Sequence, residues 1–276
     1  MRIGVCAPGT RIEPELAVKV RALAASLYPE RTPEIVFHPQ CYLSSGHFAG
    51  DDHARAQAFL QIANDPKFDA LWFARGGYGA NRIADYVLPQ LNDAARAKTY
   101  LGYSDAGFLL AGLYRVGCKH VAHGPMPVDL TRDDGAQAVK RGLLYLVDRS
   151  PETLELTVTP DVKTAAFNIM ILSSLLGTPL QPDLSGHVLM LEEINEYMYR
   201  IDRSLFHITS NPGIRRVAGI KLGRCSGVPD NDPDFVLDEE EITRSWCKRA
   251  GIAYMGRADI GHDVDNRVVP FGALTP

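Results

Sequence analysis

The 276-residue sequence has no apolar run that approaches the ~18 residues needed for a membrane-spanning helix. Its first ten residues, MRIGVCAPGT, lack the apolar core of about 7–15 residues that signal peptides carry. It also has no excess of basic residues, since the formal net charge is −4, so there is no broad positive field for nucleic acid or anionic lipid. We therefore expect a cytoplasmic protein that binds neither membranes nor nucleic acid.

Cysteine is scarce and scattered. No CxxC pair and no Cys/His cluster with zinc spacing occurs, so we expect reduced thiols, no metal and no cofactor. The five cysteines are Cys6, Cys41, Cys118, Cys225 and Cys247.

The first half of the chain alternates short apolar runs with helical patterns. RIGVCAP, EIVFHP, DALWFA, TYLGY and KHVAHG are typical of strands, and the segments between them have helical spacing. One of these segments, DDHARAQAFLQIAND, is predicted to be a helix with Asp51 or Asp52 as its cap. Such alternation predicts an α/β fold with a mostly parallel, Rossmann-like sheet flanked by helices. The carboxyl ends of its strands then share one edge, where open α/β sheets bind ligands.

The pattern changes near residue 150. Residues 149–164 are rich in Thr, Pro and Asp and indicate a linker or a loosely packed connection. Beyond it we predict helices at FNIMILSSLLGTP, MYRIDRSLFHITS and LDEEEITRSWCKRAG, and strands at HVLMLEE, VAGIKLG and IAYMG. Asp238 is the expected cap of the last of these helices. We therefore predict two domains, residues 1–150 and a smaller β/α domain at 151–276.

Two loops that follow predicted strands could carry chemistry. ARGGYGANR, residues 74–82, is neither GxGxxG nor GxxxxGK[ST], so it does not predict a phosphate site. Gly76 and Gly77 could supply backbone N–H groups to an oxyanion, or could simply form a tight turn. In GYSDAG, Ser104 could be exposed on a strand-to-helix turn, or Ser104 or Asp105 could merely cap the next helix.

A serine nucleophile needs a base and an orienting acid. Among the eight histidines, His123 ends a strand near the expected site rim, and His262 lies among polar residues in a late loop. Glu192 and Glu193 end the strand HVLMLEE. A carboxylate buried there needs a partner, whereas one on the surface does not; for Glu193 we favour a surface charge.

Taken together, these loops resemble the LD-carboxypeptidase family of serine peptidases, which includes microcin-immunity proteins. The resemblance covers nearly the whole chain, from APGT to PFG. It is carried by FAGDDHARA, DALWFARGGYGANRI, YLGYSDAGFLL, HGPM, LLGTPLQPDLSG, LMLEEINEYMYRIDR and DIGHDVDNRVVPFG.

The resemblance implies a Ser–His–Glu triad formed by the nucleophile Ser104, the acid Glu192 and the base His262. It implies that the nucleophile lies in the first domain and that the acid and base lie in a smaller, swivelling second domain. It further implies a homodimer and a muropeptide tetrapeptide substrate from which the terminal D-alanine is released during cell-wall recycling.

The backbone N–H groups of Asp105, Gly76 and Gly77 are the candidate oxyanion hole. Two residues are candidates for substrate binding. Arg75 is one because arginine suits a substrate carboxylate, and His123 is the other because it ends a strand near the expected site rim. Two further arginines, Arg200 and Arg203, are either anchors or solvated helix charges.

Two features depart from the family pattern, and two other functions stay open. Gly107 replaces the usual threonine after the SD pair, and AFN replaces the usual GGN while keeping Asn168.

One alternative function is that of a microcin-immunity-like hydrolase of aminoacyl-nucleotide amides, which would need an aromatic platform for the base; Trp246 is far from the motifs. The other is a non-catalytic ligand-binding module.

Overall fold

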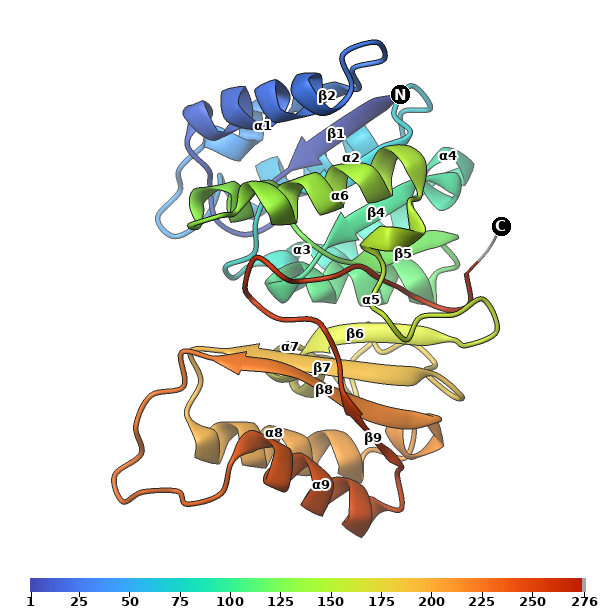
Figure 1. Cartoon of the computed structure of the whole chain (residues 1–276). Coiled ribbons are helices and arrows are strands. Elements are labelled where there is room, and N and C mark those ends of the chain that lie inside the picture. The colour runs from blue at the N-terminus through green and yellow to red at the C-terminus, as the bar shows by residue number, and fades with distance from the viewer. Residues whose placement is uncertain (275–276) are drawn as a thin grey trace.

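A computed structural model describes residues 1–274 and shows two sheets, one above the other (Figure 1). The first sheet has the strand order β10-β5-β4-β3-β1-β2 and is parallel except for β10. Its strands are β1 Arg2–Cys6, β2 Glu34–Phe37, β3 Ala70–Phe73, β4 Thr99–Gly102, β5 His120–His123 and β10 Val269–Pro270. The order reverses between β1 and β3, and ligands bind beside such a switch point in open α/β sheets.

Helices cover both faces of the first sheet. On one face lie α1 (Pro14–Leu27) and α6 (Ala136–Asp148), and on the other α2 (Asp52–Ala63), α3 (Ala80–Val87) and α5 (Gly107–Arg115). The short α4 (Asp93–Ala97) precedes β4. The Asp51 carboxylate accepts a hydrogen bond from Ala54 N, which starts α2 where the sequence predicted. Within residues 1–274, no helix has both the length and the apolar character to cross a membrane.

The second sheet is parallel throughout and has the order β6-β7-β8-β9. Its strands are β6 Thr164–Asn168, β7 Val188–Ile194, β8 Gly219–Ser226 and β9 Tyr254–Arg257, and its helices are α7 Ile169–Leu175, α8 Met198–Ser210 and α9 Glu239–Ala250. The predicted start of α9 is confirmed, because Asp238 and Glu241 form a reciprocal capping box. The mixed α/β class with a second, smaller unit is likewise confirmed.

The expected helix FNIMILSSLLGTP is partly wrong. Its first residues complete β6, and α7 begins only at Ile169, where the Asn168 side chain accepts a hydrogen bond from Ile171 N. Every residue of β6 is buried, so its sequence shows no alternation of apolar and polar side chains. A short apolar run of this kind cannot be told from a helix by its period.

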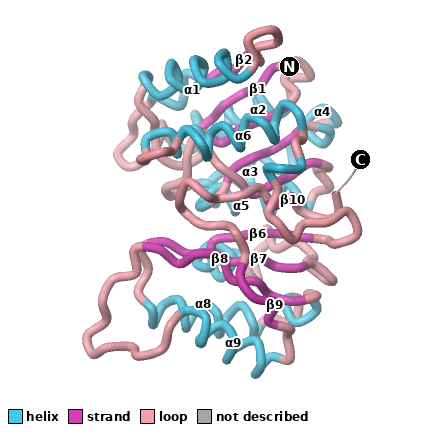
Figure 2. The backbone as a smooth tube through the Cα atoms, viewed as in Figure 1, coloured by secondary structure: helices cyan, strands magenta, loops and turns pink. Residues whose placement is uncertain are grey.

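The connection at residues 149–164 is mostly exposed from residue 156 to residue 163, but its first part is anchored to the rest of the molecule. It contains a 3₁₀ turn at Pro151–Thr153, and Glu155 is buried with its carboxylate 3.6 Å from Lys221 Nζ on β8. After β9 the chain rises from the second sheet to the first and ends in β10, antiparallel to β5 (Figures 1 and 2). The boundary near residue 150 stays a prediction, but the end of the chain joins the first sheet.

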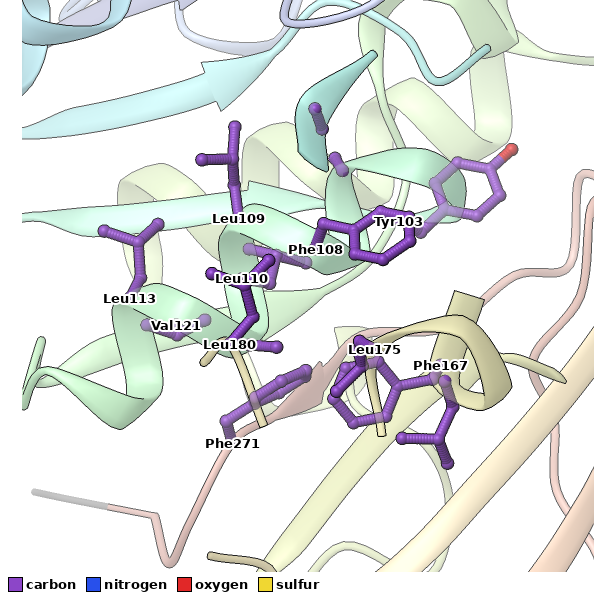
Figure 3. Close-up of a cluster of buried hydrophobic side chains, with 14 of the residues drawn as sticks. Tyr103, Phe108, Leu109, Leu110, Leu113, Val121, Phe167, Leu175, Leu180 and Phe271 are labelled. Carbon is purple, nitrogen blue, oxygen red and sulfur yellow. The ribbon is translucent and has the colours of Figure 1, made fainter. Parts of the chain in front are cut away.

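One apolar core joins the two sheets. Figure 3 shows side chains from α5 directed toward Phe167, Leu175, Leu180 and Phe271. Phe108 and Leu110 on α5 are 7% and 0% exposed, so this helix is covered on both sides. Because α5 follows Ser104 directly, the packing of α5 positions the serine between the two sheets.

Candidate active site

Ser104 lies on a strained turn between β4 and α5. Its φ angle is +59°, in the left-handed region that non-glycine residues rarely adopt. Two glycines make room for the turn. A methyl group at Gly102 would lie 2.7 Å from Cδ2 of Phe73, and one at Gly107 would lie 3.1 Å from Cγ2 of Ile171. The Gly107 departure thus has a physical reason, since α7 packs closely against the first turn of α5.

The glycine loop after β3 lies directly against this turn. A methyl group at Gly76 would lie 2.8 Å from Cβ and Oγ of Ser104 and 3.5 Å from Asp105 N, so only glycine allows this approach. Gly77 has a φ angle of +104°, and Thr10 Oγ1 donates to Gly76 O at 3.1 Å. The loop therefore brings the backbone of Gly76 next to the serine hydroxyl.

The carboxylate of Asp105 holds the two loops together. It is 2% exposed, and its Oδ2 accepts a hydrogen bond from Ala80 N at 2.8 Å, at the start of α3. Burial raises the pKa of Asp105 to about 6, although Ala80 N, the nearby Arg55 and Gly79 N oppose the shift. Arg55, itself buried, donates to Gly79 O at 2.8 Å from the other side. Asp105 is thus a support for the site as well as a candidate source of a backbone N–H.

Glu192 and His262 form a buried pair. His262 Nδ1 and Glu192 Oε2 are 2.5 Å apart, and the two residues are 8% and 0% exposed. Burial alone lowers the pKa of His262, but the charge and hydrogen bond of Glu192 outweigh it, so the pKa lies above its ordinary value. Among residues 1–274, Nε2 of His262 has no hydrogen-bond partner. The imidazole is therefore oriented through one nitrogen while the other stays available.

Ser104 and His262 line the same cavity, of about 330 Å³. Its wall consists of Arg75, Gly76, Gly77, Tyr103, Ser104, Met126, Val128, Thr131, Arg132 and His262. The structure thus brings together the serine, the histidine and the glycine loop, which lie far apart in the sequence. Glu192 lies one hydrogen bond behind the wall. Across residues 1–274 no group of three or more metal-ligating side chains is found.

Arg75 is the cavity's uncompensated cation. Its Nη1 donates to Arg11 O at 3.2 Å, while its buried Nε has no partner within the described chain. Burial lowers the pKa of Arg75, and no carboxylate of residues 1–274 forms a salt bridge with it. A partly buried guanidinium in this position is suited to an anionic ligand.

Several candidates lie elsewhere. His123 is 1% exposed behind Tyr103, with Nε2 3.2 Å from Asn266 Oδ1, and burial lowers its pKa to about 4. It does not line the cavity, which corrects its expected place at the rim. Arg200 and Arg203 are exposed on α8 and also lie outside the cavity wall.

The expected surface charge at Glu193 is wrong. Glu193 is 3% exposed and accepts hydrogen bonds from Asn168 Nδ2 at 2.5 Å and Met170 N at 2.9 Å. Burial raises its pKa to about 7, although its hydrogen bonds oppose the shift. Glu193 therefore caps α7, next to Glu192 in the chain.

Three residues at the site were not singled out in the sequence analysis: Tyr103, Asp129 and Arg132. Tyr103 lies under the imidazole of His262, with ring centroids 4.8 Å apart, and its hydroxyl donates to Asp129 Oδ1 at 2.6 Å. Arg132 lines the cavity and donates to the backbone oxygen of His262. The only signal for these residues was their place after a strand, which many structural residues share.

Comparison with known proteins gives the class of protein. Residues 3–124 match the LD-carboxypeptidase N-terminal domain, and residues 163–275 match the LD-carboxypeptidase C-terminal domain. The protein slr1534 of Synechocystis sp. is 30% identical over 246 residues, which cover 87% of this chain and 80% of that protein. The chain belongs to the LD-carboxypeptidase family, a family of serine-type peptidases.

Two further proteins that resemble this chain have names that state a substrate. The murein tetrapeptide carboxypeptidase of Pseudomonas aeruginosa is 25% identical over 283 residues, covering 95% of this chain and 90% of that protein. The crystal structure of muramoyltetrapeptide carboxypeptidase from Oxalobacter formigenes superimposes with a TM-score of 0.81 at 24% identity, covering 98% of this chain and 93% of that one. The latter similarity shows that the fold is shared.

Proposed function

We propose that this protein is a serine carboxypeptidase that uses Ser104 as nucleophile, His262 as base and Glu192 as orienting acid. The observation that carries the proposal is the shared cavity: a strained, partly exposed Ser104 lines it together with His262, whose Nε2 has no hydrogen-bond partner among residues 1–274. Strain of this kind at a cavity wall is characteristic of functional sites.

In the first step Ser104 Oγ attacks the carbonyl carbon of the amide that precedes the terminal residue. His262 Nε2 takes the hydroxyl proton, and Glu192 stabilises the resulting imidazolium through Nδ1. The negative charge that develops on the carbonyl oxygen is bound by the N–H of Asp105 and an N–H of Gly76 or Gly77.

In the second step the carbon–nitrogen bond breaks, and His262 returns the proton to the leaving amine. A water molecule then attacks the acyl ester on Ser104 and gives its proton to His262. The peptide leaves with a new carboxylate, and His262 returns the proton to Ser104.

Arg75 is proposed to bind the free α-carboxylate of the substrate. It is the cation in the cavity that lacks a charged partner, and a guanidinium binds carboxylate through two parallel hydrogen bonds. Such a contact makes the enzyme select the last residue of a chain. Arg75→Met should therefore raise KM more than it lowers kcat.

The proposed substrate is a muropeptide tetrapeptide that ends in D-alanine. Two observations support this substrate. The name of the Pseudomonas relative specifies a murein tetrapeptide, and the cation Arg75 in the cavity wall can bind a terminal carboxylate. The alternative aminoacyl-nucleotide substrate needs an aromatic platform for the base. Trp246 does not provide one, since its indole packs on Phe206, outside the cavity wall. A cytoplasmic location and a homodimer are further expectations from the family resemblance.

One experiment tests the proposal. The protein is incubated with a muropeptide tetrapeptide and, separately, with an aminoacyl sulfamoyl adenylate, and the products are followed by mass spectrometry. We expect release of D-alanine from the tetrapeptide, and loss of that activity in Ser104→Ala but not in the control Ser174→Ala, which changes an exposed serine on α7. Cleavage of the adenylate alone, or full activity of Ser104→Ala, would refute it.

A further inference from the structure

The proposed base lies on a loop that joins the two sheets. Ser104 follows β4 of the first sheet, whereas Glu192 is part of β7 in the second. His262 lies between β9 and β10, in the dark-red segment that rises from one sheet to the other (Figure 1). To work between Ser104 and Glu192, the imidazole must be held relative to both sheets.

The second sheet holds this loop through charged contacts. Glu192 binds the imidazole directly, as described above. Arg224 on β8 donates to Asp259 Oδ1 at 2.5 Å and to Asp263 Oδ1 at 2.8 Å, so both ends of the turn that carries His262 are fixed. None of these contacts involves the sheet that carries the nucleophile.

On the nucleophile's side of the molecule, Arg132 donates a hydrogen bond to His262 itself, whereas Arg141 on α6 donates to the backbone oxygens of Val264 and Asn266 farther along the same loop. Arg132 follows the 3₁₀ turn Pro127–Thr131, after β5 of the first sheet. Nη1 of Arg132 donates to the backbone oxygen of His262, and Nη2 lies 3.4 Å from the hydroxyl of Tyr103, the residue that precedes Ser104. Its Nε lies 3.2 Å from Asp129 Oδ1.

Asp129 makes this arrangement rigid. It is 0% exposed, and it accepts hydrogen bonds from the Tyr103 hydroxyl at 2.6 Å and from Met126 N at 2.8 Å. One carboxylate thus aligns Arg132 and Tyr103, which contact the backbone and the ring of His262 respectively. Hydrogen bonds that converge on a buried carboxylate in this way fix the groups that they join, although the Arg132 side chain itself is 33% exposed.

We propose that Arg132 is a positioning residue that holds the His262 loop against the first sheet and so sets the imidazole relative to Ser104. This inference rests on the proposed function, in which His262 acts on Ser104. The two arginines of the cavity wall differ in their partners. All three nitrogens of Arg132 have protein partners, one of them the carboxylate of Asp129, whereas Arg75 has no carboxylate partner among residues 1–274. Arg132 therefore acts on the base, and Arg75 on the substrate.

The test compares Arg132→Met and Arg132→Lys with a matched control, Arg215→Met. Arg215 also donates to a backbone oxygen, that of Thr209, but far from the cavity wall. The first readout is the ring ¹⁵N–¹H correlation spectrum of His262, which needs no substrate. The second is kcat and KM for release of D-alanine from a muropeptide tetrapeptide.

We expect Arg132→Met to shift or broaden the ring signals of His262 and to lower kcat by about 10- to 100-fold, as a misplaced catalytic group does, with little change in KM. Arg132→Lys should recover part of kcat, because an ammonium can still reach the carbonyl oxygen, and Arg215→Met should match the wild type. If Arg132→Met does not fold, Tyr103→Phe removes the hydroxyl that joins Arg132 and Asp129 while leaving Arg132 in place, and it should show a smaller effect of the same kind.

Two results would overturn the inference: unchanged His262 signals in a folded Arg132→Met protein, or a rise in KM with kcat preserved, which would make Arg132 a substrate anchor. Failure of the proposed function looks different. The wild type would then release no D-alanine, while the His262 spectrum would still report whether Arg132 positions the ring.

Discussion

The pair formed by Glu192 and His262 makes the sharpest prediction. In Glu192→Gln the side chain keeps its size but loses its charge, at a site where the carboxylate is 0% exposed and 2.5 Å from Nδ1. The amide oxygen can still accept from Nδ1, so the imidazole can keep its orientation. What is lost is the stabilisation of the imidazolium that forms, in the proposed mechanism, when Ser104 gives up its proton.

The size of the effect follows from the hydrogen bond. A bond to a charged group contributes about 1.5–3 kcal/mol, which corresponds to about 10- to 150-fold in rate. We therefore expect kcat of Glu192→Gln to fall by this factor or more, since burial makes the loss of charge more costly than at a surface.

The pH profile should move in a defined direction. His262 accepts a proton only when neutral, so kcat/KM of the wild type should rise as the pH passes its raised pKa, above the ordinary value of about 6.5. In Glu192→Gln burial lowers the pKa with much less opposition, so the limb should move to lower pH. Two other charged groups act on His262 and remain in both proteins: Asp129 raises its pKa and Arg132 lowers it.

The raised pKa of His262 also makes the stability of the folded protein depend on pH. A raised histidine pKa stabilises the folded state below the unfolded pKa, and that contribution is lost as the pH rises through the folded pKa. Thermal unfolding of Glu192→Gln should therefore show its largest loss at acidic pH. The control Glu196→Gln changes a partly exposed carboxylate that pairs with Arg200 and should alter neither profile. A limb that stays in place, or moves to higher pH, would refute the reasoning.

Three further substitutions test the supports of the site. Gly76→Ala places a methyl group 2.8 Å from Ser104 Oγ, so kcat should fall by about 100-fold, measured by D-alanine release. Asp105→Asn removes a carboxylate whose folded pKa is about 6, so chemical denaturation should show a gain of at most about 3 kcal/mol above pH 6, which disappears toward pH 4. Glu193→Ala leaves Asn168 Nδ2 and an N–H of α7 without acceptors, so the free energy of unfolding should fall by about 2–4 kcal/mol.

Each of these has a clear contrary result. Wild-type kcat in Gly76→Ala would mean that the glycine loop does not approach the nucleophile as described. An Asp105→Asn protein that is destabilised equally at pH 4 and pH 7 would show that the hydrogen bond to Ala80 N outweighs the cost of the buried charge. Unchanged stability in Glu193→Ala would mean that water reaches the N-terminus of α7.

Elements with a strong local signal were predicted correctly. The Asp51 and Asp238 caps mark the starts of α2 and α9 because a cap is a contact between residues three positions apart. Elements without such a signal were not. The strand β6 is buried on both faces and shows no alternation, and Glu193 resembles a solvated charge until its partners in α7 are known.

The same division holds for the site. The order and type of the motifs, with Ser104, Glu192 and His262 in sequence, predicted the family, and the family matches confirm it. The residues that surround His262, namely Tyr103, Asp129 and Arg132, were missed, because their roles depend on contacts with a loop 130 or more residues away.

Local periodicity in the sequence predicted the α/β class, and its motifs predicted the family, whose resemblance implies the candidate triad. The strain of Ser104 against Gly76 and the space that Gly107 leaves for α7 were visible only in the folded molecule. The same is true of the contacts that hold His262 from both sheets at once. These features are distances between segments far apart in the chain, and packing sets such distances when the two sheets close around one core.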